Sequence, residues 1–191
     1  MCNQVEIRLS GSGGQGLILG GIILAEAALM DDKEAVQSQS YGPEARGGAS
    51  KAEVIISDCA IHYPKVQKCD VLLSLTQKSC DKYLSNLKEN GTLIIDESVE
   101  LPEYDNNYKI HRMPILKTAT KDIGRSMVAN IVALGALNEI VKVVSDDSLE
   151  KAILNRVPRG TENLNRSAFE SGKKITLKKE WSNGRKKYWF D

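Results

Sequence analysis

A glycine-rich turn follows the first apolar segment of this 191-residue chain. Residues 9–21 read LSGSGGQGLILGG, so that Gly11, Gly13 and Gly16 have the spacing G-x-G-x-x-G. Between a strand and a helix, such a turn lets the backbone approach a ligand closely and directs the first N–H groups of the helix toward an anion. The turn therefore favours an α/β fold. It serves either to bind a phosphate or to pack the helix against the sheet or another subunit.

A dinucleotide site makes one further demand that this chain does not meet. It needs an acidic residue about 20 residues on, at the end of the second strand. The expected second strand, 34–40, ends in QSQS, and Asp31, Asp32 and Glu34 lie before it or at its start. Gln15 also stands where a dinucleotide site often has a small residue, and no G-K-[ST] follows for ATP. Two roles for the turn stay open: the backbone of Gly14–Gly16 binds an anion, or the turn serves only for packing.

The apolar periodicity predicts alternating strands and helices along the chain. We expect strands at residues 5–10, 34–40, 51–57, 70–75, 92–96 and 108–115. Helices are expected at 17–30, 76–90, 126–144, after a cap at Ser145, and from 161 to a stop at Gly172. The helical face of 126–144 includes Met127, Val128, Ile131, Leu134, Leu137 and Val141. The order predicts an α/β single domain with a mostly parallel sheet flanked by helices.

The charge is uneven along the chain, although the net charge is only +1. Residues 173–191 hold seven Lys or Arg against two acidic residues, which gives them +5 and leaves −4 for residues 1–172. Both tryptophans, Trp181 and Trp189, lie in this segment. We therefore divide the chain into a domain, 1–172, and a basic aromatic C-terminal tail, 173–191. The tail is expected to form a hairpin at Asn183-Gly184, with subunit docking or nucleic-acid binding as alternatives.

The four cysteines and two histidines show no catalytic or metal-binding pattern. Cys2, Cys59, Cys69 and Cys80 form no C-x-x-C pair, and no secretion signal or membrane-length apolar run is visible, so reduced thiols in the cytoplasm are expected. Cys69 and Cys80 fall at expected core or helix-face positions, although a reactive thiol is not ruled out by their spacing. His62 and His111 are expected to be structural.

A second loop, 41–50, has the sequence YGPEARGGAS. Its glycines permit left-handed turns, its proline stiffens it, and it follows a strand end, where α/β proteins bind ligands. The candidate residues of this loop are Tyr41, Gly42, Glu44, Arg46, Gly47 and Gly48. The Arg46 guanidinium can fork onto a phosphate or carboxylate, whereas in the alternative it pairs with Glu44 or with a partner chain.

Four motifs in order resemble the gamma subunit of the 2-oxoacid:ferredoxin oxidoreductases. They are GSGGQG at 11–16, SYGPEARGG at 40–48, NIVALGAL at 130–137 and NRSAFESG at 165–172. The likeness spans about residues 4–172. The residues of the second motif and the shortness of the chain are most similar to the 2-oxoglutarate branch of the family. Branched-chain oxoacids and indolepyruvate stay open as alternative substrates.

The resemblance implies a subunit that is inactive alone within a larger enzyme. That enzyme would convert a 2-oxoacid to an acyl-CoA and CO2 and pass electrons to ferredoxin. Thiamine diphosphate, Mg and iron–sulfur clusters would belong to alpha, beta and, where present, delta subunits. The resemblance and the anion-binding chemistry together suggest that the glycine turn, including Gly13, Gly14 and Gln15, and the 41–48 loop frame the CoA or active-site entrance. The alternatives are a free-standing dinucleotide-binding oxidoreductase and a basic-tailed interaction protein.

Overall fold

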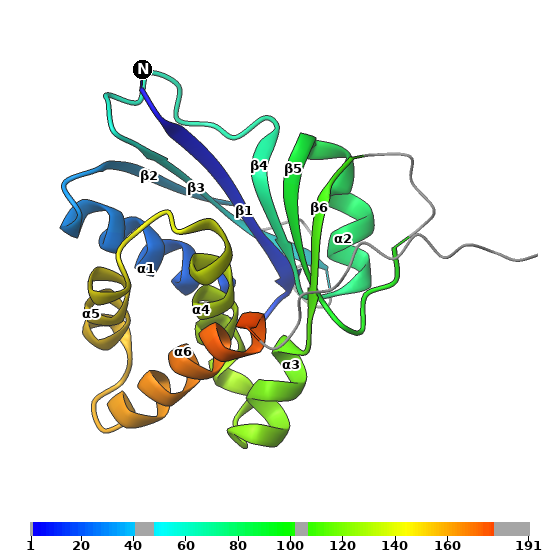
Figure 1. Cartoon of the computed structure of the whole chain (residues 1–191), viewed down its shortest axis with the longest axis vertical. Coiled ribbons are helices and arrows are strands. Elements are labelled where there is room, and N and C mark those ends of the chain that lie inside the picture. Colours follow the sequence, from blue (N-terminus) through cyan, green and yellow to red (C-terminus); the bar gives the residue numbers. More distant parts are fainter. Residues whose placement is uncertain (1, 41–47, 102–106, 178–191) are drawn as a thin grey trace, which may run out of the picture.

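Six strands form one sheet in the computed structural model, which describes residues 2–40, 48–101 and 107–177. The strands are β1 (Gln4–Ser12), β2 (Glu34–Ser40), β3 (Ala49–Ser57), β4 (Cys69–Ser74), β5 (Leu87–Asp96) and β6 (Lys109–Met113). Their order across the sheet is β2-β3-β1-β4-β5-β6 (Figure 1). The pairs β1–β4, β4–β5 and β5–β6 are parallel, and β3 alone runs against its neighbours β1 and β2. The predicted mostly parallel sheet is confirmed.

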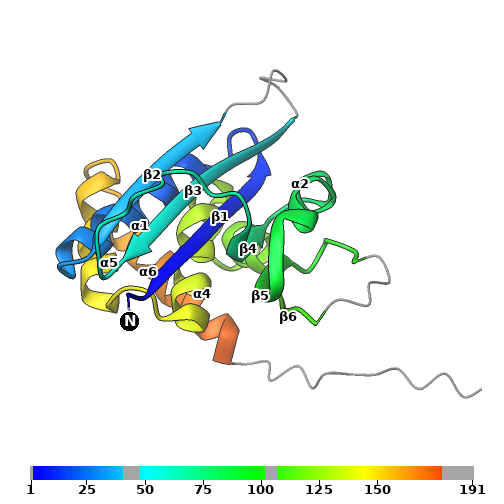
Figure 2. The same cartoon turned by 90° about the horizontal axis from the view of Figure 1, so that it is seen from above.

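The helices are distributed unequally over the two faces of the sheet. One face is covered by α1 (Leu17–Met30), α4 (Ala129–Val141), α5 (Asp146–Arg156) and α6 (Glu162–Leu177) (Figures 1 and 2). The other face carries the short α2 (Gln77–Tyr83). Between β6 and α4 the chain forms α3 (Ile115–Lys117), a π-helical turn (Thr118–Asp122) and a 3-10 turn (Ser126–Val128).

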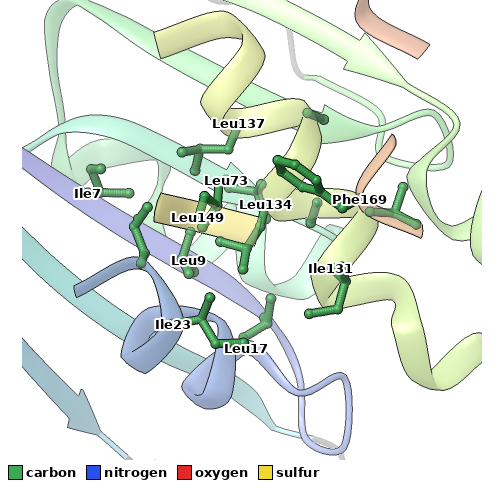
Figure 3. Packing of buried hydrophobic residues seen from close by; sticks show 14 of the residues in the cluster. Ile7, Leu9, Leu17, Ile23, Leu73, Ile131, Leu134, Leu137, Leu149 and Phe169 are labelled. Atoms are coloured by element: carbon green, nitrogen blue, oxygen red, sulfur yellow. The ribbon is translucent and has the colours of Figure 1, made fainter. Parts of the chain in front are cut away.

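The main core lies between the sheet and the four larger helices. Ile7 and Leu9 of β1 point into it, and they meet Ile23 of α1 and Leu134 of α4 (Figure 3). Arg8, between them in sequence, points to the opposite face, as the alternation of a strand requires. A second cluster packs α2 against that face. A side chain of Leu or Ile size contributes about 1.5–3 kcal/mol when fully buried, so this core is a main source of the stability of the domain.

The predictions for the first half of the chain were correct at 17–30 and 34–40, and wrong at 76–90. The helix there ends at Tyr83, a 3-10 turn covers Leu84–Asn86, and β5 begins at Leu87. Leu87 packs in the hydrophobic cluster under α2, but it does so from a strand. Asn90 adopts a left-handed conformation, with φ 60°, inside β5 and does not end a helix.

Two helix predictions in the second half need correction. The helix expected at 126–144 begins only at Ala129, and Met127 is 83% exposed in the preceding 3-10 turn. Gly172 does not end the last helix, because α6 continues to Leu177. Gly172 is instead a contact point: an added Cβ would lie 3.0 Å from the carbonyl carbon of Val132 and 3.1 Å from the nitrogen of Ala136 in α4. The division of the chain at residue 172 stays a prediction, and the expected hairpin lies outside the described residues.

The expectation of four reduced thiols is also wrong, since Cys2 and Cys59 form a disulfide. Gln4 pairs with Ser57 in the β1–β3 ladder, and the N–H of Asp58 donates to the carbonyl of Asn3. Continuing this register places Cys2 opposite Cys59. The sheet itself therefore brings the two sulfurs together, which their separation of 57 residues in sequence did not suggest.

Candidate functional site

The glycine turn lies at the point where the sheet reverses its order. From β1 the chain crosses through α1 to β2 on one side, whereas β4 pairs with β1 on the other side. The carboxyl ends of the parallel strands β1 and β4 therefore lie together at a topological switch point. This is where open α/β sheets bind ligands.

The backbone of the turn is shaped by its glycines. Gly14 and Gly16 have φ of 90° and 71°, a region that residues with a side chain rarely adopt. Added Cβ atoms at Gly13 and Gly14 would meet no atom within 4 Å, so this part of the turn is open to a ligand or a partner. Gly16 is the N-cap of α1 and supplies no capping side chain, and the first turn of the helix has no acidic residue. The N–H groups of that first turn face outward as donors without intrahelical partners.

Gln15 does not project from the turn. Its Oε1 accepts a hydrogen bond of 2.8 Å from the N–H of Ser12, and this folds the side chain back over Gly11. A Cβ at Gly11 would collide with that amide and would lie 2.8 Å from Leu17 Cδ1. Gln15 therefore braces the turn, and Gly11 makes room for it. This gives a physical reason for a large residue at a position where a dinucleotide site often has a small one.

A hollow of about 270 Å³ opens beside the turn. One wall is made by Gly13, Gly14 and Gln15. The rest is lined by Leu116, Thr120, Ser126, Met127 and Ala129, from the connection between β6 and α4. The lining combines apolar side chains with two hydroxyls and the glycine backbone. None of the second set was predicted as a site residue, because nothing in the sequence brings residues 116–129 next to residues 13–15.

Three cations accompany this connection. Lys117, Lys121 and Arg125 are exposed, and each is next in sequence to a residue that lines the hollow. Of these three cations, only Lys117 forms an ion pair with another described residue, Glu97 at 3.9 Å. An apolar hollow with backbone donors and flanking cations suits an anionic ligand that also has an apolar part.

The 41–48 loop begins and ends at the same edge of the sheet as the glycine turn. Ser12, in the turn, pairs with Ala49 at the start of β3, and Ser40 at the end of β2 pairs with Lys51. Gly48 is buried directly before β3. The predicted residues Tyr41, Gly42, Glu44, Arg46 and Gly47 lie outside the described residues, so their contacts stay a prediction.

Other candidates have structural explanations. Burial raises the pKa of both Cys69 and Cys80 to about 11, so neither is a thiolate at neutral pH. Burial, and then Lys109, lowers the pKa of His111, which keeps it neutral. His62 is exposed. Among the described residues, no group of three or more His, Cys, Asp or Glu could hold a metal ion. In the same part of the chain, no helix has the length and apolarity to span a membrane.

A buried ion cluster occupies the α2 face of the sheet. Arg8 and Lys51 both contact Oε1 of Glu53, at 2.6 and 2.7 Å, and the guanidinium lies 5.4 Å from the ring centre of Tyr83. Nη1 of Arg8 has no hydrogen-bond partner within the described part of the chain. Since the Arg8 side chain is only 3% exposed, we interpret the cluster as an internal brace between β1 and β3.

The fold and the turn define an α/β domain of the doubly wound kind, with an open glycine turn at the switch point of its sheet. The sequence pattern of the family described as pyruvate ferredoxin/flavodoxin oxidoreductase matches residues 6–175. The chain belongs to this family, as the four motifs predicted.

Three individual proteins illustrate the likeness. A 2-oxoglutarate synthase subunit KorC from Methanocaldococcus jannaschii is 52% identical over 175 residues, which cover 89% of this chain and 92% of the relative. The gamma subunit of a keto/oxoacid ferredoxin oxidoreductase from Geobacter sulfurreducens PCA has a solved structure with a TM-score of 0.84 and 52% identity, covering 92% of this chain and 98% of that one.

The third likeness concerns the fold alone. The 2-oxoglutarate:ferredoxin oxidoreductase from Magnetococcus marinus, solved with 2-oxoglutarate, coenzyme A and succinyl-CoA bound, matches with a TM-score of 0.83 at 20% identity. The alignment covers 94% of this chain but only 32% of that one. The same fold therefore occurs both as a separate subunit and as part of a longer chain.

Proposed function

We propose that this chain is the gamma subunit of a 2-oxoglutarate:ferredoxin oxidoreductase, which forms succinyl-CoA and CO2 and passes electrons to ferredoxin. The observation that carries the proposal is the 52% identity to the M. jannaschii 2-oxoglutarate synthase subunit over nearly the full length of both chains. The alternative of a free-standing dinucleotide-binding oxidoreductase is not favoured, because these relatives are subunits and the ribose-binding acid is missing after β2.

The catalytic cofactors are assigned to the other subunits. Thiamine diphosphate, Mg and the iron–sulfur clusters belong to the alpha, beta and, where present, delta subunits, and ferredoxin reaches this chain only through the complex. The site described above has backbone N–H donors and cations but no cluster of metal ligands among the described residues. We further place the complex in the cytoplasm.

The glycine turn and its hollow are proposed to frame the CoA entrance of the alpha/beta pair. CoA carries phosphates that suit the N-terminus of α1 and the cations at 117, 121 and 125, and an apolar arm that suits the lining of Leu116 and Met127. The 41–48 loop, with Glu44 and Arg46, borders the same edge. In the alternative, these surfaces contact only the partner subunits.

Kinetics of the reconstituted complex test the whole proposal. The complex should oxidise 2-oxoglutarate in preference to pyruvate, branched-chain oxoacids and indolepyruvate, and should need this chain for CoA-dependent turnover. A complex that prefers another 2-oxoacid would overturn the substrate, and turnover by the isolated chain would overturn the subunit role.

Charge-removing variants test the CoA site. Lys121→Gln with Arg125→Gln should raise the KM for CoA about five- to tenfold, since charge-assisted contacts to phosphate are lost. Lys151→Gln, on the exposed side of α5, is the matched control and should leave this KM unchanged. Arg46→Ala tests the second loop in the same assay. If the KM for CoA is unchanged in all these variants and the subunits still associate normally, the surface does not bind CoA and is only a subunit contact.

A further inference from the structure

The two walls of the hollow are tied together by one buried side chain, Asn130 at the start of α4. Its Nδ2 donates to the carbonyl oxygen of Gly16 at 3.1 Å, across 114 residues of sequence. Its Oδ1 accepts from the N–H of Ile131 at 3.0 Å. The residue is only 4% exposed, so this amide is held at both ends and does not reach solvent.

The contact is specific for glycine at the other side. An added Cβ at Gly16 would lie 2.8 Å from Nδ2 of Asn130 and 3.1 Å from its Cγ. The same Gly16 carbonyl also accepts the first hydrogen bond of α1, from the N–H of Gly20 at 2.9 Å. Asn130 therefore binds Gly16, the residue whose carbonyl starts the hydrogen bonding of α1 and sets the direction of its first turn.

The position of this contact relates it to the hollow. Gly13, Gly14 and Gln15 of one wall come directly before Gly16, and Ser126, Met127 and Ala129 of the other wall come directly before Asn130. A change in the Asn130–Gly16 distance would thus change the separation of the two walls.

We infer that Asn130 is a positioning residue for the glycine turn: it sets the width of the hollow and the direction of the donors at the N-terminus of α1. It does not touch the ligand, and it acts through the carbonyl of Gly16. This inference rests on the proposed function, since CoA is the ligand by which its effect is measured.

Asn138 offers a matched control in the same helix. It is also fully buried, and its Nδ2 donates to the carbonyl of Val144 and to Asp146, each at 3.0 Å. Its Oδ1 accepts from the N–H of Val144. Asn138 therefore ties the far end of α4 with three hydrogen bonds, one more than Asn130 makes, but away from the hollow. Loss of stability alone should therefore affect Asn138 variants at least as strongly as Asn130 variants.

The experiment compares Asn130→Asp and Asn138→Asp in the assembled enzyme. Aspartate keeps the shape but places an oxygen against the Gly16 carbonyl. We expect the KM for CoA to rise about tenfold in Asn130→Asp, with most of the loss in KM rather than kcat, and to stay within twofold of wild type in Asn138→Asp. A neutral variant, Asn130→Ser, has a short donor and should show a smaller rise.

Amide hydrogen exchange gives a readout that does not depend on CoA. In the free gamma subunit, Asn130→Asp should speed exchange in the peptide that contains residues 11–20, and Asn138→Asp should not. If exchange there is unchanged, or if both variants raise the KM for CoA equally, the positioning role is wrong. If exchange is faster but the KM for CoA does not change, Asn130 does not position a CoA site. Failure of the proposed function would be recognised separately, as a wild-type complex without CoA-dependent turnover.

Discussion

The close contact between helices α4 and α6 leads to a quantitative prediction about stability. Helices α4 and α6 cross where Gly135 and Gly172 let their backbones touch: an added Cβ at Gly135 would lie 3.2 Å from the carbonyl carbon of Phe169 and 3.3 Å from Cα of Gly172. At Gly172 the atoms met by a Cβ all belong to the backbone of α4, at Val132 and Ala136. No side-chain rotation can relieve such a clash, so Gly172→Ala must push the two helices apart.

The magnitude follows from two opposing terms. Alanine is favoured over glycine in a helix interior by about 1 kcal/mol. Overpacking costs about 1–3 kcal/mol, and a clash with backbone belongs at the upper end of that range. The expected result is a net loss of about 2 kcal/mol, which lowers the Tm by about 4–8 °C for a domain of this size.

Gly20→Ala is the matched control. Gly20 is a buried glycine in α1, and an added Cβ would lie 3.6 Å from Leu9 Cδ1, at ordinary contact distance. This variant should keep the helix-propensity gain without a clash and raise the Tm by about 2–4 °C. Thermal unfolding of the isolated gamma subunit, followed by circular dichroism at the same pH and ionic strength, measures both. If Gly172→Ala were as stable as Gly20→Ala, the close crossing of α4 and α6 would be refuted.

Two further predictions concern covalent and ionic ties. Reduction of Cys2–Cys59, or Cys59→Ser, should cost up to about 4 kcal/mol because the pair closes a long loop, and a Tm unchanged by dithiothreitol would contradict this. The hydrogen bond between Lys173 and Asp146 is the largest cause of two pKa shifts: it lowers the pKa of Asp146 and raises the pKa of Lys173. Lys173→Met should therefore lose up to about 1 kcal/mol in urea unfolding at neutral pH, more than Lys174→Met. The difference should vanish as the pH falls well below 3.8, where Asp146 binds a proton, and also as the pH rises through the raised pKa of Lys173; its persistence in acid would exclude the ion pair.

The sequence was most informative where local patterns decide the structure. The run Leu17–Met30 is apolar, starts after a glycine and lies between two strand patterns, and it forms α1 at the predicted residues. The helix cap at Ser145 was also predicted, and its side chain accepts from the N–H of Ser148. In such segments the periodicity and the cap chemistry agree with the tertiary contacts, so local reasoning is sufficient.

Local reasoning was misleading where tertiary packing overrides local preference. Gly172 looks like a helix stop by composition, yet it is needed inside α6 for the contact with α4. Met127 fits the apolar spacing of the next helix but lies in a 3-10 turn and is exposed. The resemblance to the family had located NIVALGAL and NRSAFESG, and the structure supplies their physical role: Gly135 and Gly172 belong to these two motifs and form the crossing.

The candidate site was only half visible in the sequence. Gly11, Gly13, Gly14, Gln15 and Gly16 were identified because their spacing is local. The opposite wall and Asn130 were missed, because their proximity depends on how β6 and α4 are placed around the sheet. Asn130 is the first residue of the motif NIVALGAL, and a polar amide within that apolar run was the one signal in the sequence; its burial at the start of α4 is known only from the structure.

The reversed direction of β3 has a consequence for how this family of subunits can diversify. Since β2 and β3 form an antiparallel hairpin at the rim, insertion of residues in pairs would extend it outward while keeping every inward-facing side chain in place. No helical crossover would need to be rebuilt, as it would for a parallel pair. The length of the β2–β3 hairpin can therefore change without rearrangement of the rest of the sheet or its helices.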